Sequence, residues 1–189
     1  MGDTTVIPFF VQLDLITGKL SSFSERVVRR LSDLRGLVAD EVALRRELER
    51  GDRIVYEVFK INVPPIQGHL FFNVTVIHPG KIGEEYHFTK GHYHMNEQAA
   101  EIYIGVQGKG LLLMRSYNNF RVIEMQRGVL AYIPPGWGHR SVNVSHDPFV
   151  FLSIYPANAG YDYERIMREG MGKRVFATSN GQGYRIVDD

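Results

Sequence analysis

Three histidines and one glutamate, in two separated segments, constrain how this chain can fold. The first segment reads TKGHYH and ends with His92 and His94, and Glu101 follows in an apolar run. Side chains alternate between the two faces of a strand, so His92 and His94 point the same way. His139 comes from a distant segment. To meet the other three, it needs a β-sheet that folds back on itself.

The four residues form a donor set typical of a metal site. Three imidazoles and one carboxylate suit Fe, Mn, Ni, Co or Zn and leave coordination positions open for a substrate. A His-x-His pair alone is usually accidental, but the second segment adds a fixed pattern from Gly128 through Pro134-x-Gly136 to Asn143. We therefore expect one divalent metal ion per subunit, with Fe first among the candidates. The predicted ligands are His92, His94, Glu101 and His139.

Composition excludes several other classes of protein. The 189 residues fit one domain with a substantial core. The net charge of +1 implies neither a nucleic-acid nor a membrane partner. The absence of cysteine excludes disulfides, thiolate ligands and a cysteine nucleophile. Together with the lack of an apolar signal segment, it favours the cytoplasm.

The pattern of elements predicts a mainly β protein. Short apolar strands separated by Gly, Pro and Asn turns run through the chain from Arg53 onward, which indicates a sandwich or barrel. Asp40 and Gly51 bracket a short helix, and a second helix is expected from Asp162 to Glu169. The expected strands are 54–61, 69–77, 101–106, 110–115, 120–125, 129–133, 140–144 and 149–155, with a further strand at 6–13 and a terminal hairpin of 175–178 and 184–187 joined by 179–183.

The same pattern predicts the organisation of the chain as a single domain over 1–189. Residues 1–52 are expected to form a strand and helix extension packed on the barrel, because the dense strand pattern starts only after them. The barrel core is expected over 53–156 and the C-terminal helix and hairpin over 157–189.

Two levels of resemblance follow from these residues. The metal segments resemble the cupin superfamily. Over nearly its whole length the chain resembles the archaeal cupin-type glucose-6-phosphate isomerases. The blocks that carry the second resemblance are VRRLSDL at 28–34, VYEV at 55–58, TKGHYH at 89–94, AEIY at 100–103, YIPPGWGHR at 132–140 and YPANAGYDY at 155–163. The six residues between His94 and Glu101 exceed the usual cupin gap but are similar to the isomerase family. One departure is Tyr161, where the family often has His.

The resemblance implies a cupin (jelly-roll or double-stranded β-helix) barrel with a few short peripheral helices. It also implies a homodimer and the interconversion of glucose 6-phosphate and fructose 6-phosphate in glycolysis and gluconeogenesis. An aldose–ketose isomerase moves hydrogen between adjacent carbons, either as a proton through an enediol or as a hydride beside a metal. Glu101 is expected as a ligand and as the leading candidate for a base. Tyr155 is expected to donate its hydroxyl to a substrate oxygen.

A sugar phosphate also needs contacts for its phosphate and hydroxyl groups. Thr89 and Gly91 immediately precede the first histidine and offer a hydroxyl and an approachable backbone N–H. Strict alternation would instead place Lys90 on the histidine face. Tyr103 shares the face of Glu101, although each tyrosine here can equally be a packed core residue. By resemblance the substrate contacts are Tyr56, Thr75, Thr89, Gly91 and Tyr163, and by position Tyr103 joins them.

Two other functions fit the same ligands. A cupin dioxygenase also uses three histidines and a glutamate, but it needs an organic ring or diketone substrate and a more apolar pocket. A non-enzymatic sugar-binding cupin would bind without turnover. Metal binding does not distinguish the isomerase, dioxygenase and sugar-binding hypotheses, whereas turnover of a sugar phosphate does.

Overall fold

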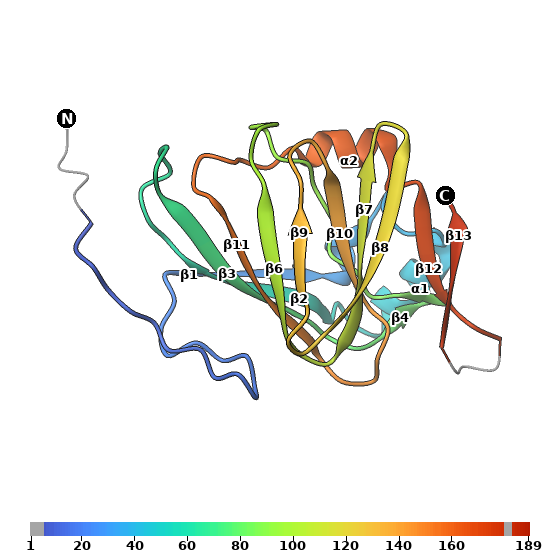
Figure 1. The fold of residues 1–189 in the computed structure, drawn as a ribbon. Coiled ribbons are helices and arrows are strands. Elements are labelled where there is room, and N and C mark those ends of the chain that lie inside the picture. The colour runs from blue at the N-terminus through green and yellow to red at the C-terminus, as the bar shows by residue number, and fades with distance from the viewer. Residues whose placement is uncertain (1–5, 180–182) are drawn as a thin grey trace.

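The computed structural model describes residues 6–179 and 183–189, and most of this chain is β-structure (Figure 1). The strands are β1 (Glu25–Arg30), β2 (Ile54–Ile61), β3 (Leu70–Ile77), β4 (Lys81–Ile82), β5 (Glu85–Tyr86), β6 (Glu101–Gln107), β7 (Lys109–Ser116), β8 (Asn119–Gln126), β9 (Leu130–Ile133), β10 (Gly138–Asn143), β11 (Phe149–Pro156), β12 (Lys173–Ala177) and β13 (Tyr184–Asp188). The helices are a 3-10 turn (Leu31–Leu34), α1 (Glu41–Arg50) and α2 (Tyr163–Glu169).

The strands form three antiparallel sheets. The largest runs β1-β2-β3-β11-β6-β9, a second runs β10-β7-β8, and a third runs β13-β12-β5-β4. The late strand β11 lies between the early strands β3 and β6, as expected when a chain folds back over itself. Figure 1 shows α2 across one end of the body, with the N-terminal segment extending away from it. The predicted mainly β architecture is confirmed.

The register of the large sheet places polar side chains in rows on one face. Lys60 lies opposite Asn73, Asn73 opposite Ser153, and Ser153 opposite Tyr103. Directly paired residues share a face of the sheet, so these four side chains form one row. Thr75 lies two residues along β3 and therefore points the same way. This polar face becomes one wall of the cavity described below.

Apolar side chains from the six-stranded and the three-stranded sheets fill the interior. Leu112 on β7 and Phe149 on β11 are fully buried, and Phe88 and Phe151 are nearly so. Burying a side chain of this size stabilises the fold by ~1.5–3 kcal/mol. The polar wall can therefore persist inside the protein because a large apolar core surrounds it.

Local capping explains both α-helices. The Asp40 carboxylate accepts the backbone N–H groups of Val42 and Ala43, each at 2.9 Å, and the N–H of Gly51 closes the other end of α1. Asp162 accepts the N–H of Arg165 at 3.0 Å at the start of α2. Both predicted helices are thus confirmed. No helix in the described part of the chain is long and apolar enough to cross a membrane.

Several elements differ from those expected. Residues 6–13 form no regular strand; within the described ranges, Leu13 makes one isolated bridge to Leu20, and Phe10 is 89% exposed. That prediction was wrong because strand propensity needs a pairing partner. Conversely, β1 was not predicted, because it has only two apolar residues among four charged ones and is stabilised by pairing with β2.

The terminal hairpin of β12 and β13 is confirmed by five paired residues on each strand. Its predicted connection, 179–183, falls partly outside the described residues. The division of the chain at residues 52 and 156 stays a prediction, although β1 is hydrogen-bonded into the largest sheet.

Candidate metal centre and active-site cavity

His92 and His139 face each other across an isolated antiparallel bridge. The N–H of each donates to the carbonyl of the other, at 3.1 and 3.0 Å, and the imidazole centroids are 4.4 Å apart. Gly91 makes this approach possible. Its φ is +74°, and a Cβ there would lie 2.8 Å from the His139 carbonyl oxygen. Only glycine satisfies both conditions without strain.

The other two predicted ligands join this pair. Glu101 Oε2 lies 3.2 Å from His94 Nε2 and 3.0 Å from His139 Nε2. One donor atom from each of the four residues lies within 4.8 Å of the others. Tyr93 points elsewhere, because it bridges to Asp162 and packs under the Arg165 guanidinium. The structure therefore brings together the whole predicted ligand set, although the segment 92–94 is a pair of bridges rather than a regular strand.

Backbone carbonyls orient two of the imidazoles. The Nδ1 of His94 lies 3.1 Å from the Ala99 carbonyl oxygen, and the Nδ1 of His139 lies 3.3 Å from that of Trp137. A carbonyl only accepts, so each Nδ1 carries a proton and each Nε2 is directed towards the centre. Histidine ligands of metals usually donate their other ring N–H to an acceptor of this kind.

The centre has donor atoms that need a cation. The Nε2 of His92 is buried and has no hydrogen-bond partner among the described residues, and the Nε2 of His139 faces only Glu101 Oε2, at 3.0 Å. In neutral His139, the Nε2 lone pair faces the Glu101 carboxylate, so two acceptors oppose each other unless a cation or a proton lies between them. The residues therefore fit a divalent metal of the borderline class.

Electrostatics keep the glutamate ionised. Burial by itself would raise the pKa of Glu101, but the charge and hydrogen bonds of His139 and His94 outweigh burial and hold this pKa at about 2. Burial, together with the charge of His139, lowers the pKa of His92 well below its ordinary value. Burial also raises the pKa of Tyr155. At neutral pH the centre thus combines a carboxylate with a tyrosine that remains a hydroxyl donor.

A cavity of about 510 Å³ opens beside the centre. His92, Glu101 and His139 line it, together with every predicted substrate-contact residue and the second catalytic candidate. These residues are Tyr56, Thr75, Thr89, Gly91, Tyr103, Tyr155 and Tyr163. Lys90 lines a smaller adjoining cavity of about 150 Å³ instead, so Thr89 rather than Lys90 lies beside the histidines.

Several lining residues were not among the predicted site residues, and they include Arg29, Asn73, Ser153 and Tyr161. The Asn73 amide donates to the Tyr155 hydroxyl, which also contacts the Tyr161 hydroxyl. Asn73 could have been found because it lies two residues from Thr75 on the same strand face. Arg29 had no such signal, because β1 was not expected to be a strand.

Comparison with known proteins identifies the family. The family described as glucose-6-phosphate isomerase (GPI) matches residues 28–189. The glucose-6-phosphate isomerase of Thermococcus onnurineus is 45% identical over 183 residues, covering 96% of this chain and 95% of that protein. The chain belongs to the glucose-6-phosphate isomerase family. The isomerase of Pyrococcus furiosus is 42% identical over 183 residues, covering 96% of this chain and 95% of that protein. The isomerase of Sinorhizobium medicae is 39% identical over 185 residues, covering 96% and 86%.

Solved structures confirm the cupin fold of this isomerase-family chain. Oxalate oxidase, a cupin solved in complex with the substrate analogue glycolate, superposes with a TM-score of 0.50 at 16% identity. The match covers 59% of this chain and 56% of that one. At that identity the likeness concerns the fold alone.

One feature of this family member is its tyrosine pair at the cavity wall. The Tyr161 ring lies 4.9 Å from that of His92 at an interplanar angle of 76°. Burial is the largest influence on the pKa of Tyr161 and raises it to about 12. Tyr161 is therefore a neutral hydroxyl at physiological pH.

Proposed function

We propose that this protein interconverts glucose 6-phosphate and fructose 6-phosphate, using one divalent metal ion held by the four-residue centre. The observation that carries the proposal is the convergence of these donors beside a hydroxyl-lined cavity, in a chain of the glucose-6-phosphate isomerase family. The metal ligands would be His92, His94, Glu101 and His139.

The charges along β1 suggest where the phosphate binds. Three cationic side chains line the cavity, but Lys60 pairs with Glu25 at 3.2 Å and Arg26 donates to Glu57 at 2.6 Å. Arg29 makes no ion pair with a described carboxylate, and its described hydrogen bond is to a backbone carbonyl. A guanidinium is well suited to a phosphate group.

Residues next to Arg29 complete this end of the cavity. Tyr56 lies opposite Arg29 in the sheet, and its hydroxyl accepts the N–H of Lys90 at 3.4 Å. Thr89, Gly91 and Tyr163 line the same cavity. We assign this group, with Thr75 and Tyr103 along the sheet wall, to binding of the sugar phosphate.

The chemical end of the substrate would lie at the metal centre. A bound divalent cation would supply Lewis-acid polarisation of the sugar oxygens at C1 and C2. Both imidazole contacts of Glu101 are made by Oε2, which leaves Oε1 facing no described partner. On the enediol route, the Glu101 carboxylate takes the proton from C2 and returns it to C1, and the Tyr155 hydroxyl donates to the oxygen that gains charge. On the hydride route Glu101 acts only as a ligand.

Three finer assignments accompany this function. We propose Fe as the native metal, with Mn, Ni, Co or Zn as substitutes, because the donor set accepts all of them. We propose a homodimer, supported by the exposed apolar row of Ile102, Leu130 and Tyr132 on the outer face of β6 and β9. We propose action in the cytoplasm, where sugar phosphates are metabolised.

The dioxygenase and non-enzymatic readings are not favoured. The polar side chains of Asn73, Thr75 and Ser153 on one wall of the cavity suit the hydroxyl groups of a sugar better than an organic ring. A purely sugar-binding module would not need the isomerase likeness that extends through 96% of the chain.

The decisive experiment is conversion of fructose 6-phosphate to glucose 6-phosphate by purified protein, after chelation and after adding back Fe, Mn, Ni, Co and Zn singly. We expect activity to disappear with chelator and to return with at least one metal. His146→Ala provides a control at an exposed histidine and should behave as wild type. If the protein binds metal but does not convert the sugar phosphate, the isomerase proposal is contradicted, and the dioxygenase or sugar-binding hypothesis is favoured.

A further inference from the structure

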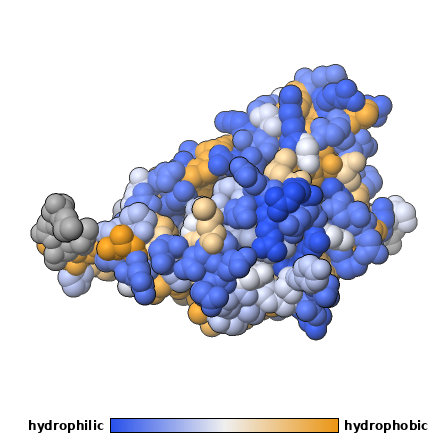
Figure 2. Space-filling view, turned by 90° about the horizontal axis from the view of Figure 1, so that it is seen from above, coloured by the Kyte–Doolittle hydropathy of each residue, from blue (hydrophilic) through white to orange (hydrophobic). Residues whose placement is uncertain are grey.

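A second cavity, of about 490 Å³, lies away from the metal centre. Side chains from β7, β10, α2 and β12 line it, and its charged members are Arg115, Arg140, Arg168, Glu169, Arg174 and Asp189. Four guanidinium groups face two carboxylates, which leaves an excess of two positive charges. Figure 2 views the molecule from the side on which α2 lies and shows a mostly hydrophilic surface there.

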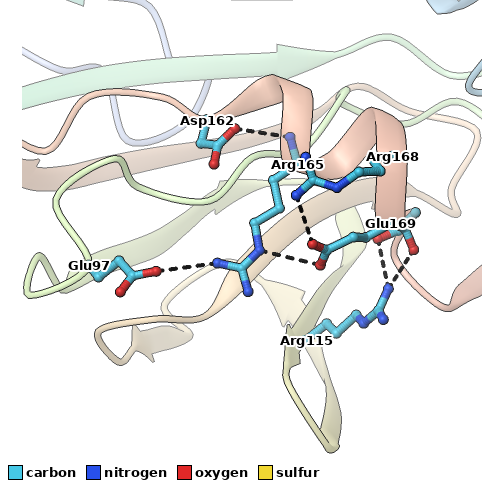
Figure 3. Close-up of polar contacts among 7 residues, drawn as sticks. Glu97, Arg115, Asp162, Arg165, Arg168 and Glu169 are labelled. Atoms are coloured by element: carbon cyan, nitrogen blue, oxygen red, sulfur yellow. Dashed lines mark hydrogen bonds and ion pairs between the residues drawn. The ribbon is translucent and has the colours of Figure 1, made fainter.

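The two carboxylates of this arginine cavity are already engaged. Glu169 accepts from Arg168 at 3.1 Å and from Arg165 at 3.3 Å (Figure 3). Asp189 accepts from Arg174 at 2.5 Å. Arg174 also donates to the buried Glu85 carboxylate, at 3.1 Å, so the ion pairs of these carboxylates involve Arg165, Arg168 and Arg174 and neither of the other two cavity arginines. The excess positive charge falls to Arg115 and Arg140.

Arg115 has N–H donors that are not used within the described structure. Its Nη1 donates to the carbonyls of Glu169 and Gly170, at 2.6 and 3.1 Å, at the end of α2 (Figure 3). Its Nε and Nη2 have no partner among the described residues. The contacts to the carbonyls offset the partial negative charge of the helix end and hold the guanidinium at the cavity wall.

Arg140 is a buried cation that makes no ion pair in the described structure, and the nearby carboxylates Glu85 and Asp189 are both engaged by Arg174. It is 3% exposed, and its Nε and Nη2 both donate to the Lys90 carbonyl oxygen, at 3.3 and 2.9 Å. It makes no ion pair with any carboxylate that the structure describes, and its guanidinium lies 4.7 Å from the Phe88 ring. Buried charges are normally paired, so this unpaired one points to a ligand.

We propose that the arginine cavity binds a small phosphate-type dianion, at a site distinct from the sugar-phosphate cavity. Guanidinium groups recognise phosphate oxygens through paired N–H donors, and two groups with free donors match the two charges of the ligand. The volume of about 490 Å³ has room for a phosphorylated metabolite as well as for free phosphate.

The position of this site relates it to the metal centre. Arg140 follows His139 in sequence and holds the carbonyl of Lys90, which precedes Gly91. The small cavity of about 150 Å³ lies between the sugar-phosphate cavity and the arginine cavity. It shares Gly91 with the first and Ile166 with the second. The two sites are therefore neighbours joined by one loop.

The test is calorimetric titration of inorganic phosphate into metal-loaded protein, against chloride at equal ionic strength. Replacing Arg140 could unfold the protein, so the variants lie at the rim: the Arg168 side chain is 69% exposed and that of Glu169 is 32% exposed. Arg168→Gln should weaken phosphate binding at least about threefold, since it removes a cation near the anion. Glu169→Gln should tighten it about threefold, since it removes a like charge. Arg121→Gln, on exposed β8 surface, is the matched control and should have no effect.

Phosphate will also occupy the sugar-phosphate cavity, but neither Arg168 nor Glu169 lines that cavity. A binding event that responds to these two variants in opposite directions therefore belongs to the arginine cavity. Equal affinities in wild type, Arg168→Gln and Glu169→Gln, or no phosphate binding at all, would overturn the proposal.

Discussion

His87 should make the fold sensitive to mild acid. It is fully buried, its Nδ1 donates to the His78 carbonyl at 3.0 Å, and its Nε2 has no partner among the described residues. The ring lies against Gly80, where an added Cβ would come within 2.5 Å of it. Burial is the dominant influence and lowers the pKa of His87 to about 4, against 6.5 for an exposed histidine.

The sign of the effect follows from proton binding. Between pH 6.5 and 4 the unfolded chain binds a proton at His87 and the folded chain does not, so acidification favours unfolding. The stability that neutral His87 contributes to the fold is fully present above pH 6.5 and is lost progressively as the pH falls towards 4. The pKa difference lowers the free energy of unfolding by about 3 kcal/mol once the pH is below both pKa values, and by about 2 kcal/mol at pH 5. This is a large part of the typical stability of a single domain.

The assay is urea unfolding at pH 7 and pH 5 for wild type, His87→Gln and His146→Gln. His146 is exposed, so the second variant is a matched control for the substitution itself. We expect wild type and His146→Gln to lose about 2 kcal/mol more of their free energy of unfolding on acidification than His87→Gln does. Metal-ligand protonation is common to all three proteins and cancels in the comparison. Equal losses in wild type and His87→Gln would refute the reasoning.

Three further predictions concern the site. His94→Ala should lose bound metal and turnover together, measured by elemental analysis beside the isomerase assay; full turnover in a metal-free variant would refute its role as a ligand. Thr89→Val should raise KM for the sugar phosphate by roughly tenfold while lowering kcat less, because a hydrogen bond to a charged group contributes ~1.5–3 kcal/mol; an unchanged KM would remove Thr89 from the phosphate site. Isomerisation in heavy water should incorporate deuterium at the migrating position if Glu101 transfers a proton through an enediol. Absence of deuterium there would favour the hydride route.

Much of the metal centre could be predicted from sequence because its ligands lie in local patterns. The sequence alone shows the spacing of His92, His94 and Glu101 and the turn before His139. In the structure, all four donors lie within 4.8 Å of one another. The two helices were equally readable, since Asp40 and Asp162 act on backbone groups only two or three residues away. Gly136, in the turn before His139, has a φ of +76°, which glycine adopts without strain.

Other features depend on partners far away in the chain. The segment at 6–13 has apolar residues but is hydrogen-bonded to none of the described strands β1–β13, whereas β1 is charged and yet pairs along β2. Strand formation depends on such a partner more than on intrinsic preference. Arg29 and Asn73 enter the cavity for the same reason, because the register of the large sheet decides which side chains share its inner face.

By itself, the sequence determined the family, the mainly β class, the capped helices and the identity of the metal-site donors. Each of these depends on residues that lie close together in the chain or on sequence blocks that resemble the family. Only the tertiary structure decided that Tyr155 meets Tyr161 and Asn73, and that Arg140 is buried against the Lys90 carbonyl with no ion pair among the described residues. Such contacts join residues up to 82 positions apart, and they arise from sheet register and burial, which no local pattern encodes.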